Sequence, residues 1–255
     1  MEINLTIMSG CFAVQSNIKP EKLYHQIVKK ELEKNLKYIL NINILRYERF
    51  GSCFEKIKNY AEVYKIDVLL FQIRTEQFLR ISKLYYTYSD EDKKKKRALT
   101  LPFLNRVPPE NHDLLQLNLT VPTNNKERQK IYNRIKIYLN YFFGMIAGNR
   151  RYALKKYEEL IFEVITFCKE KNIKLIFLGP GSRPHISTEN KIAGKLHYYF
   201  KTVIENKNIP FISFIGEKNE NNEPIFFENG IHVNENGHRK AATLLTEKIK
   251  QVFSI

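Results

Sequence analysis

Short apolar runs rich in β-branched residues alternate with longer segments of helical periodicity, and this alternation constrains the fold more than any other feature. It is typical of a parallel sheet that is covered by helices on both faces. We expect five strands, at residues 3–8, 42–45, 68–73, 174–178 and 211–214. The sequence therefore predicts an α/β chain of about five parallel strands joined by right-handed crossovers.

The segments between these runs carry the helical pattern. Pro20 stands at a helix start, and apolar residues recur at helical spacing from Leu23 to Leu32. Further helices are expected at 54–64, 189–206 and 235–252, with two more inside 126–171 that separate between Gly144 and Gly148.

One stretch departs from the alternation. Residues 87–125 combine a charge run with Pro102, Pro108, Pro109 and Pro122, and they are too long for a simple connection. We expect an inserted, lid-like segment within a single domain that spans residues 1–255.

The chain carries a net charge of +15, which raises the question of a nucleic-acid partner. The excess is spread along the whole chain and accompanies abundant Asn, Ile, Tyr and Phe, a bias expected from AT-rich codons. We therefore disfavour nucleic acid as a partner. The basic run 93–97 is interpreted as a solvated loop tip, with contact to an anionic surface, such as a membrane, or to an acidic polymer or a phosphorylated substrate as the alternative.

Three features that the sequence lacks indicate the cellular compartment of the protein. It shows no secretory pattern near Met1 and no apolar run of the ~20 residues that a membrane helix needs. Its three cysteines, Cys11, Cys53 and Cys168, are too widely spaced for a disulfide framework or a metal pair. We expect a cytoplasmic protein without a transmembrane segment.

The most specific motif lies at residues 226–238, which read Phe-Phe-Glu-Asn-Gly-Ile-His-Val-Asn-Glu-Asn-Gly-His. It resembles the last motif of the SGNH (GDSL-type) hydrolases, DGxHPNxxGH, whose Asp and His complete a Ser-His-Asp triad. In this chain Asn229 stands at the Asp position and His232 at the His position. The resemblance implies a three-layer, flavodoxin-like α/β/α sandwich with an acyl-transfer site.

Further candidates follow the strands, because ligands bind at the carboxyl ends of parallel strands. After the first strand, Ser9-Gly10-Cys11 stands where the family has Gly-Asp-Ser, which places Cys11 at the nucleophile position. A strand end that leads toward a helix N-terminus exposes a thiol and lowers its pKa. Ser9 remains a second candidate nucleophile, and a buried apolar role is the alternative for Cys11.

The resemblance also implies an oxyanion hole. It would comprise the backbone N–H groups of Cys11 and Gly51, and the family's Gly-x-Asn after the third strand is replaced here by Arg74 and Glu76. An ionised Glu76 cannot donate, whereas the Arg74 guanidinium can, unless it serves only a structural ion pair with Glu76 or Glu48.

Two residues are assigned to substrate binding. Glu76 is one, and the other is Arg183, which follows the fourth strand on a loop rich in Gly and Pro. Arg183 suits a carboxylate, phosphate or sugar group, although the loop composition is equally consistent with stiffening alone.

The substitutions at the triad are consistent with one another. A thiolate–imidazolium pair needs only a neutral Asn to orient the ring, so Cys11, His232 and Asn229 form a coherent Cys-His-Asn site. The sequence thus predicts an esterase or acyltransferase that acts on a small or glycan-linked acyl group through a covalent acyl-enzyme. The alternative is a catalytically silent SGNH-like domain that binds a ligand or a protein.

We expect neither a metal nor another cofactor. His232 and His238 are six residues apart, and no cluster of Asp, Glu or Cys residues lies beside them. The chain also carries no glycine-rich motif of the kind that binds the phosphates of a nucleotide.

Overall fold

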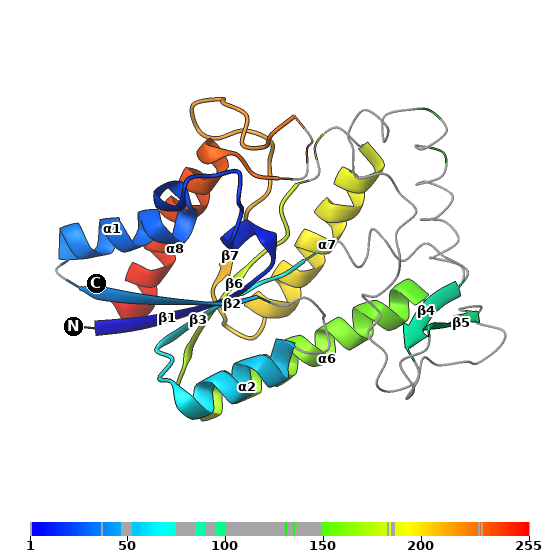
Figure 1. Cartoon of the computed structure of the whole chain (residues 1–255), viewed down its shortest axis with the longest axis horizontal. Coiled ribbons are helices and arrows are strands. Elements are labelled where there is room, and N and C mark those ends of the chain that lie inside the picture. Colours follow the sequence, from blue (N-terminus) through cyan, green and yellow to red (C-terminus); the bar gives the residue numbers. More distant parts are fainter. Residues whose placement is uncertain are drawn as a thin grey trace.

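A five-stranded parallel sheet forms the centre of the molecule (Figure 1). The computed structural model describes residues 2–36, 38–46, 53–74, 85–89, 95–99, 131, 135, 149–182, 184, 187–228, 230 and 232–254. The strands are β1 (Glu2–Ser9), β2 (Ile39–Arg46), β3 (Val68–Gln72), β6 (Lys174–Leu178) and β7 (Phe211–Ile212). Their order across the sheet is β2-β1-β3-β6-β7, which confirms the predicted parallel α/β fold.

Helices cover both faces of this sheet. The helices α1 (Tyr24–Leu36) and α8 (Glu235–Phe253) pack on one face, and α2 (Cys53–Val63), α6 (Asn149–Glu170) and α7 (Ser187–Glu205) pack on the other. Figure 1 shows α1 and α8 on one side of the strands and α2 and α6 on the opposite side. The result is the three-layer α/β/α sandwich that the sequence predicts.

Alternating side chains explain why each strand is apolar along its whole length. In β3, Leu70 faces the cluster that includes α1 and α8, whereas Leu69 and Phe71 face the cluster on the opposite side. All three are fully buried. A strand that is buried on both faces has no polar side, as is usual in parallel sheets.

The largest differences from the predicted strand boundaries, of two or three residues, are in β2 and β7. The strand β2 begins at Ile39, three residues earlier than expected, because it pairs with β1 over eight residues, from Glu2↔Ile39 to Ser9↔Arg46. Conversely, β7 ends at Ile212 rather than at Phe214, since only two of its residues pair with β6.

A separate antiparallel pair is formed by β4 (Tyr85–Ser89) and β5 (Lys95–Leu99). Aromatic and β-branched residues in β4 favour extended structure, and these two strands are not among the five that the sequence predicts. Residues 90–94 and 100–130 lie outside the described residues, so the expectation of a lid over 87–125 stays a prediction.

The long helical segment is seen in part. Its C-terminal portion is α6, and residues 131 and 135 are also helical, whereas the expected break at 144–148 lies outside the described residues. Among the helices described, none has the combination of length and apolar character that would let it cross a bilayer.

Candidate active site

The turn that follows β1 presents Cys11 at the carboxyl edge of the sheet. A 3₁₀ turn, Cys11–Ala13, begins directly after Gly10, with Phe12 and Ala13 buried and Cys11 exposed. The other two cysteines, Cys53 and Cys168, are buried between the sheet and its helices. Burial raises the pKa of the Cys168 thiol to about 12, so that Cys11 is the cysteine placed for chemistry.

The side chain of Arg74 lies against this turn. A Cβ atom on Gly10 would stand 3.0 Å from Cζ and 3.1 Å from Nε and Nη1 of Arg74, so glycine allows the guanidinium to pack on the backbone. The backbone N–H of Arg74 donates to the hydroxyl of Tyr157 in α6 at 3.0 Å. Because Tyr157 is 1% exposed, a buried contact fixes the point at which Arg74 leaves the sheet.

Ser9, the second candidate nucleophile, is the last residue of β1. It is fully buried, and its hydroxyl donates to Oε1 of Gln72, the last residue of β3. The same oxygen accepts from the backbone N–H of Gly10 at 3.4 Å. Ser9 and Gln72 therefore connect the ends of two adjacent strands beneath the Cys11 turn.

His232 is carried by a tight hairpin between β7 and α8. Phe226 and Val233 pair as an antiparallel bridge, and the N–H of Phe227 donates to the carbonyl of His232 at 2.9 Å. Gly230, with a φ of 63°, provides the left-handed residue at the turn. This hairpin contains the motif residues on which the sequence resemblance depends.

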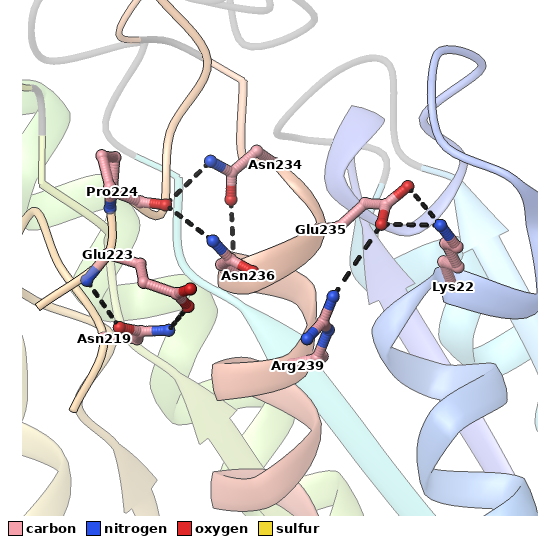
Figure 2. Close-up of polar contacts among 9 residues, drawn as sticks. Lys22, Asn219, Glu223, Pro224, Asn234, Glu235, Asn236 and Arg239 are labelled. Atoms are coloured by element: carbon pink, nitrogen blue, oxygen red, sulfur yellow. Dashed lines mark hydrogen bonds and ion pairs between the residues drawn. The ribbon is translucent and has the colours of Figure 1, made fainter. Parts of the chain in front are cut away.

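The cap of α8 holds the hairpin at its base (Figure 2). Asn234 accepts from the N–H of Gly237 at 3.1 Å, while its Nδ2 donates to the carbonyls of Pro224 at 2.8 Å and Phe226 at 3.2 Å. Asn236 also donates to Pro224, at 3.5 Å. The Asn234 side chain thus caps α8 and also binds the backbone of residues 224–226, which lead into the hairpin.

Gly237 is required by close packing at the same place. A Cβ atom there would lie 2.1 Å from Cγ1 of Val233 and 2.4 Å from the carbonyl oxygen of Ile225. The absent side chain lets the first turn of α8 approach the hairpin. Asn234 and Gly237 of the motif therefore have structural roles.

His238 is buried in the first turn of α8. Its Nδ1 accepts from the backbone N–H of Tyr24 at 3.2 Å, and its ring lies 4.9 Å from that of Phe12. Burial, reinforced by nearby His25, lowers the pKa of His238 to about 4. The neutral ring packs against Phe12, the residue that follows Cys11.

The loop after β6 closes another side of the site. His197 in α7 contacts the carbonyl of Pro180 at 3.2 Å through Nδ1 and the hydroxyl of Ser213 at 3.0 Å through Nε2. Ser182 accepts from the N–H of Gly216 at 2.7 Å. These contacts hold the ends of β6 and β7 at fixed separation.

These elements surround a pocket of about 70 Å³ at the carboxyl end of the sheet. Its described lining consists of Gly10, Cys11, Phe12, Gln15, Gln72, Ile73, Arg74, Leu178, Gly179, Pro180, Gly181, Ser182, Phe214, Phe226, His232 and Val233. Cys11, His232 and Arg74, which carry a thiol, an imidazole and a guanidinium, thus line one hollow whose wall is part apolar and part polar. This combination offers a nucleophile, a proton acceptor and a cationic hydrogen-bond donor.

The structure brings together three of the residues that the sequence singles out, namely Cys11, Arg74 and His232. Ser9 lies behind the pocket and does not line it. The remaining candidates, Gly51, Glu76, Arg183 and Asn229, lie outside the described residues. In the described part of the chain, no group of three or more His, Cys, Asp or Glu residues is arranged to hold a metal ion.

Sequence reasoning missed three polar residues of the pocket, Gln15, Gln72 and Ser182. Gln72 ends a predicted strand, so the strand-end rule that identified Cys11 could also have found it. Gln15 had no such signal, because its role depends on Val233, 218 residues away.

The fold is shared with esterases of known structure. The chain resembles the psychrotrophic esterase EstA from Pseudoalteromonas sp. with a TM-score of 0.54 and 8% identity, covering 99% of this chain and 99% of that chain. For an acetyl xylan esterase, AlAXEase, the TM-score is 0.55 at 11% identity, with 96% and 99% covered. For a lipolytic protein of the G-D-S-L family from Veillonella parvula DSM 2008 it is 0.50 at 10% identity, with 96% and 97% covered.

The sequence comparisons add no relative. No protein-family model matches the chain, and a comparison with curated proteins finds no match. At these identities the structural likeness establishes the fold alone: the chain has the fold of the SGNH (GDSL-type) esterases.

Proposed function

We propose that this protein is an esterase or acyltransferase in which Cys11 is the nucleophile and His232 the general base. The observation that carries the proposal is the meeting of Cys11, His232 and Arg74 in one pocket at the carboxyl end of the sheet. That edge is where parallel α/β sheets bind ligands. The fold shared with esterases supports the same reaction class.

In the first half of the reaction, His232 takes the thiol proton and Cys11 attacks the acyl carbonyl carbon. The carbonyl oxygen becomes an oxyanion, which the Cys11 backbone N–H and the Arg74 guanidinium stabilise, together with the Gly51 backbone N–H. The carbon–oxygen bond of the ester then breaks, and His232 returns its proton to the departing alcohol. The product is a thioester on Cys11.

In the second half, water or a second alcohol or amine attacks the thioester. His232 accepts a proton from the attacking group, the oxyanion forms again, and the carbon–sulfur bond breaks. Cys11 leaves as a thiolate and recovers the proton from His232. Water as acceptor gives an esterase, and another alcohol or amine gives an acyltransferase.

Asn229 completes the site as the residue that orients His232. Its place three residues before His232 in the sequence supports this role. A neutral amide is sufficient because the thiolate itself carries the negative charge beside the imidazolium. Glu76 and Arg183 are the proposed contacts for the rest of the substrate.

The pocket supports a small acyl group. Its volume of about 70 Å³ is about half of the ~150 Å³ cavity that accommodates benzene in an engineered protein core. The rings of Phe12, Phe214 and Phe226 form an apolar wall. Likeness in fold to an acetyl xylan esterase makes a glycan-linked acyl group a reasonable substrate class.

We also propose that the protein acts in the cytoplasm, on a small-molecule or glycan substrate rather than on nucleic acid. The wide spacing of Cys11, Cys53 and Cys168 along the chain, which fits no disulfide framework, is consistent with a reducing compartment.

A second candidate function is a catalytically silent binding domain on the same fold. The observations in its favour are the Asn at position 229 and the Glu at position 76, where the family has the triad Asp and the oxyanion Asn. This candidate predicts a ligand in the pocket without covalent chemistry at Cys11.

Intact-protein mass spectrometry after brief exposure to p-nitrophenyl acetate separates these functions. We expect one acetyl adduct on the wild type and on Ser9→Ala, no adduct on Cys11→Ala, and slow formation on His232→Ala. Loss of the adduct in Ser9→Ala alone would move the nucleophile to Ser9. Equal, lysine-type labelling of all four proteins would favour the silent binding domain.

A further inference from the structure

Gln15 lies between the two parts of the candidate site. It follows the Cys11–Ala13 turn by two residues, lines the pocket and is 6% exposed. Its Nε2 donates to the carbonyl oxygen of Val233 at 2.7 Å, a buried contact across 218 residues of sequence. The side chain therefore links the nucleophile turn directly to the hairpin that carries His232.

The hairpin itself shows why this contact matters. The carbonyl of His232 accepts from Phe227 at 2.9 Å within the hairpin, and the carbonyl of the next residue, Val233, accepts from Gln15. The backbone is thus held on one side by its own hairpin and on the other by the segment after Cys11. The second of these contacts joins the hairpin to the segment that follows Cys11.

Two other contacts lie nearby in sequence and join residues 22–24 to α8. The N–H of Tyr24 donates to buried His238, and Lys22 pairs with Glu235 at 2.7 Å near the surface (Figure 2). Both reach α8 rather than the hairpin loop. Among these three contacts, only that of Gln15 is made from within the pocket and next to His232.

We propose that Gln15 is a positioning residue that fixes the His232 hairpin against the Cys11 turn. The catalytic part of this inference rests on the proposed function, whereas the holding of the hairpin does not. Because only a donor can satisfy the Val233 carbonyl, the amide is specifically required. An ionised Glu at this position would place two acceptors opposite each other.

Hydrogen–deuterium exchange tests the holding role without any activity assay. The probes are the N–H groups of Phe227 and Asn234, which donate inside the hairpin at 2.9 and 3.0 Å. We expect Gln15→Met, which keeps the length but loses the donor, to raise their exchange about tenfold, and Gln15→Glu to raise it further. Amides of β3 should exchange as in the wild type.

Lys22→Met is the matched control, because it removes a contact to α8 that lies outside the pocket and does not reach the hairpin. It should leave the hairpin amides unchanged. If Gln15→Met leaves them unchanged as well, or if both variants raise exchange equally, Gln15 has no specific role in holding the hairpin.

Acylation by p-nitrophenyl acetate tests the catalytic consequence. In Gln15→Met we expect the maximal rate of adduct formation on Cys11 to fall about tenfold while the half-saturating ester concentration stays constant, since the pocket remains but the base is displaced. Raised exchange with unchanged acylation would refute the positioning role. A wild type that is never acylated would refute the proposed function, and exchange alone would then decide whether Gln15 holds the hairpin.

Discussion

The hairpin at residues 226–233 and the first turn of α8 adjoin in sequence, and each carries a histidine of the same motif. His232 lines the pocket and is half-buried, whereas His238 is fully buried and accepts a hydrogen bond from Tyr24. Burial lowers the pKa of His238 to about 4, which keeps its ring neutral. Position relative to the sheet edge, rather than residue type or motif, separates a candidate base from a structural ring.

The comparison extends to what surrounds each ring. The turn at α8 is packed so closely that Gly237 has no room for a Cβ atom. The hairpin, in contrast, is held by backbone hydrogen bonds, the Asn234 cap and the contact from Gln15. Stability and chemistry should therefore respond to different substitutions in two adjacent regions.

The largest effect is expected on activity. His232→Ala should slow acylation of Cys11 by about 10²–10⁴-fold, the usual contribution of a general base. His238→Asn, which retains an acceptor for the Tyr24 N–H, should remain near the wild-type rate. Timed intact-protein mass spectrometry measures both rates. Equal losses in the two variants would show that the separation of roles is wrong.

The next effect concerns stability and pH. The folded pKa of His238, about 4, is below its ordinary value of 6.5, so the unfolded chain binds the proton more readily between these values. The stabilisation is complete above pH 6.5 and falls by about 3 kcal/mol as the pH drops to 4.

Urea unfolding at pH 7 and at pH 4.5 measures this loss. His238→Asn should lose much less stability than the wild type over the same interval, because the substituted side chain does not titrate. Burial also lowers the pKa of His25, but that residue is present in both proteins, so the difference between them reports His238. Identical losses would contradict the assignment.

Close packing at the helix start gives a smaller effect. Gly237→Ala should lower the free energy of unfolding by about 2 kcal/mol, since the new Cβ would overlap Val233 and the Ile225 carbonyl. Gly194→Ala in α7 is the control, because a Cβ there meets nothing within 4 Å. The control should be slightly more stable than the wild type. Urea titration of both variants provides the measurement.

The smallest effect is expected at the surface. Lys22→Met removes the ion pair with Glu235. The side chain of Lys22 is 44% exposed and that of Glu235 is 38% exposed. Exposed pairs contribute little in water, so the urea midpoint should barely move. A marked decrease that disappears at high salt would instead show that this ion pair helps to hold α8.

Much of the fold could be predicted because it depends on local periodicity. The segment Lys174–Leu178 is a strand as expected, and α8 ends one residue beyond its predicted end. The errors fall where pairing decides the boundary: β2 is extended by its eight-residue register with β1, and β7 is shortened. Neither length is visible in the sequence of the strand alone.

Site residues that belong to short sequence motifs could be predicted, whereas those that depend on long-range contacts could not. Cys11 and His232 were found from short motifs and from their place after a strand and before a helix, and Arg74 from its place after β3. Placing Ser9 behind the pocket required the buried contact with Gln72. The proposed roles of Asn229, Gly51, Glu76 and Arg183 stay predictions from sequence.

The sequence by itself determined which segments form the strands of the central sheet and the helices that cover it, since side-chain periodicity acts within a few residues. It also determined which residue types stand at the strand ends. Only the tertiary structure decided the order β2-β1-β3-β6-β7 and brought Gln15 to Val233. Such contacts depend on the burial of whole faces and on backbone groups that find partners far along the chain, and no local pattern encodes them.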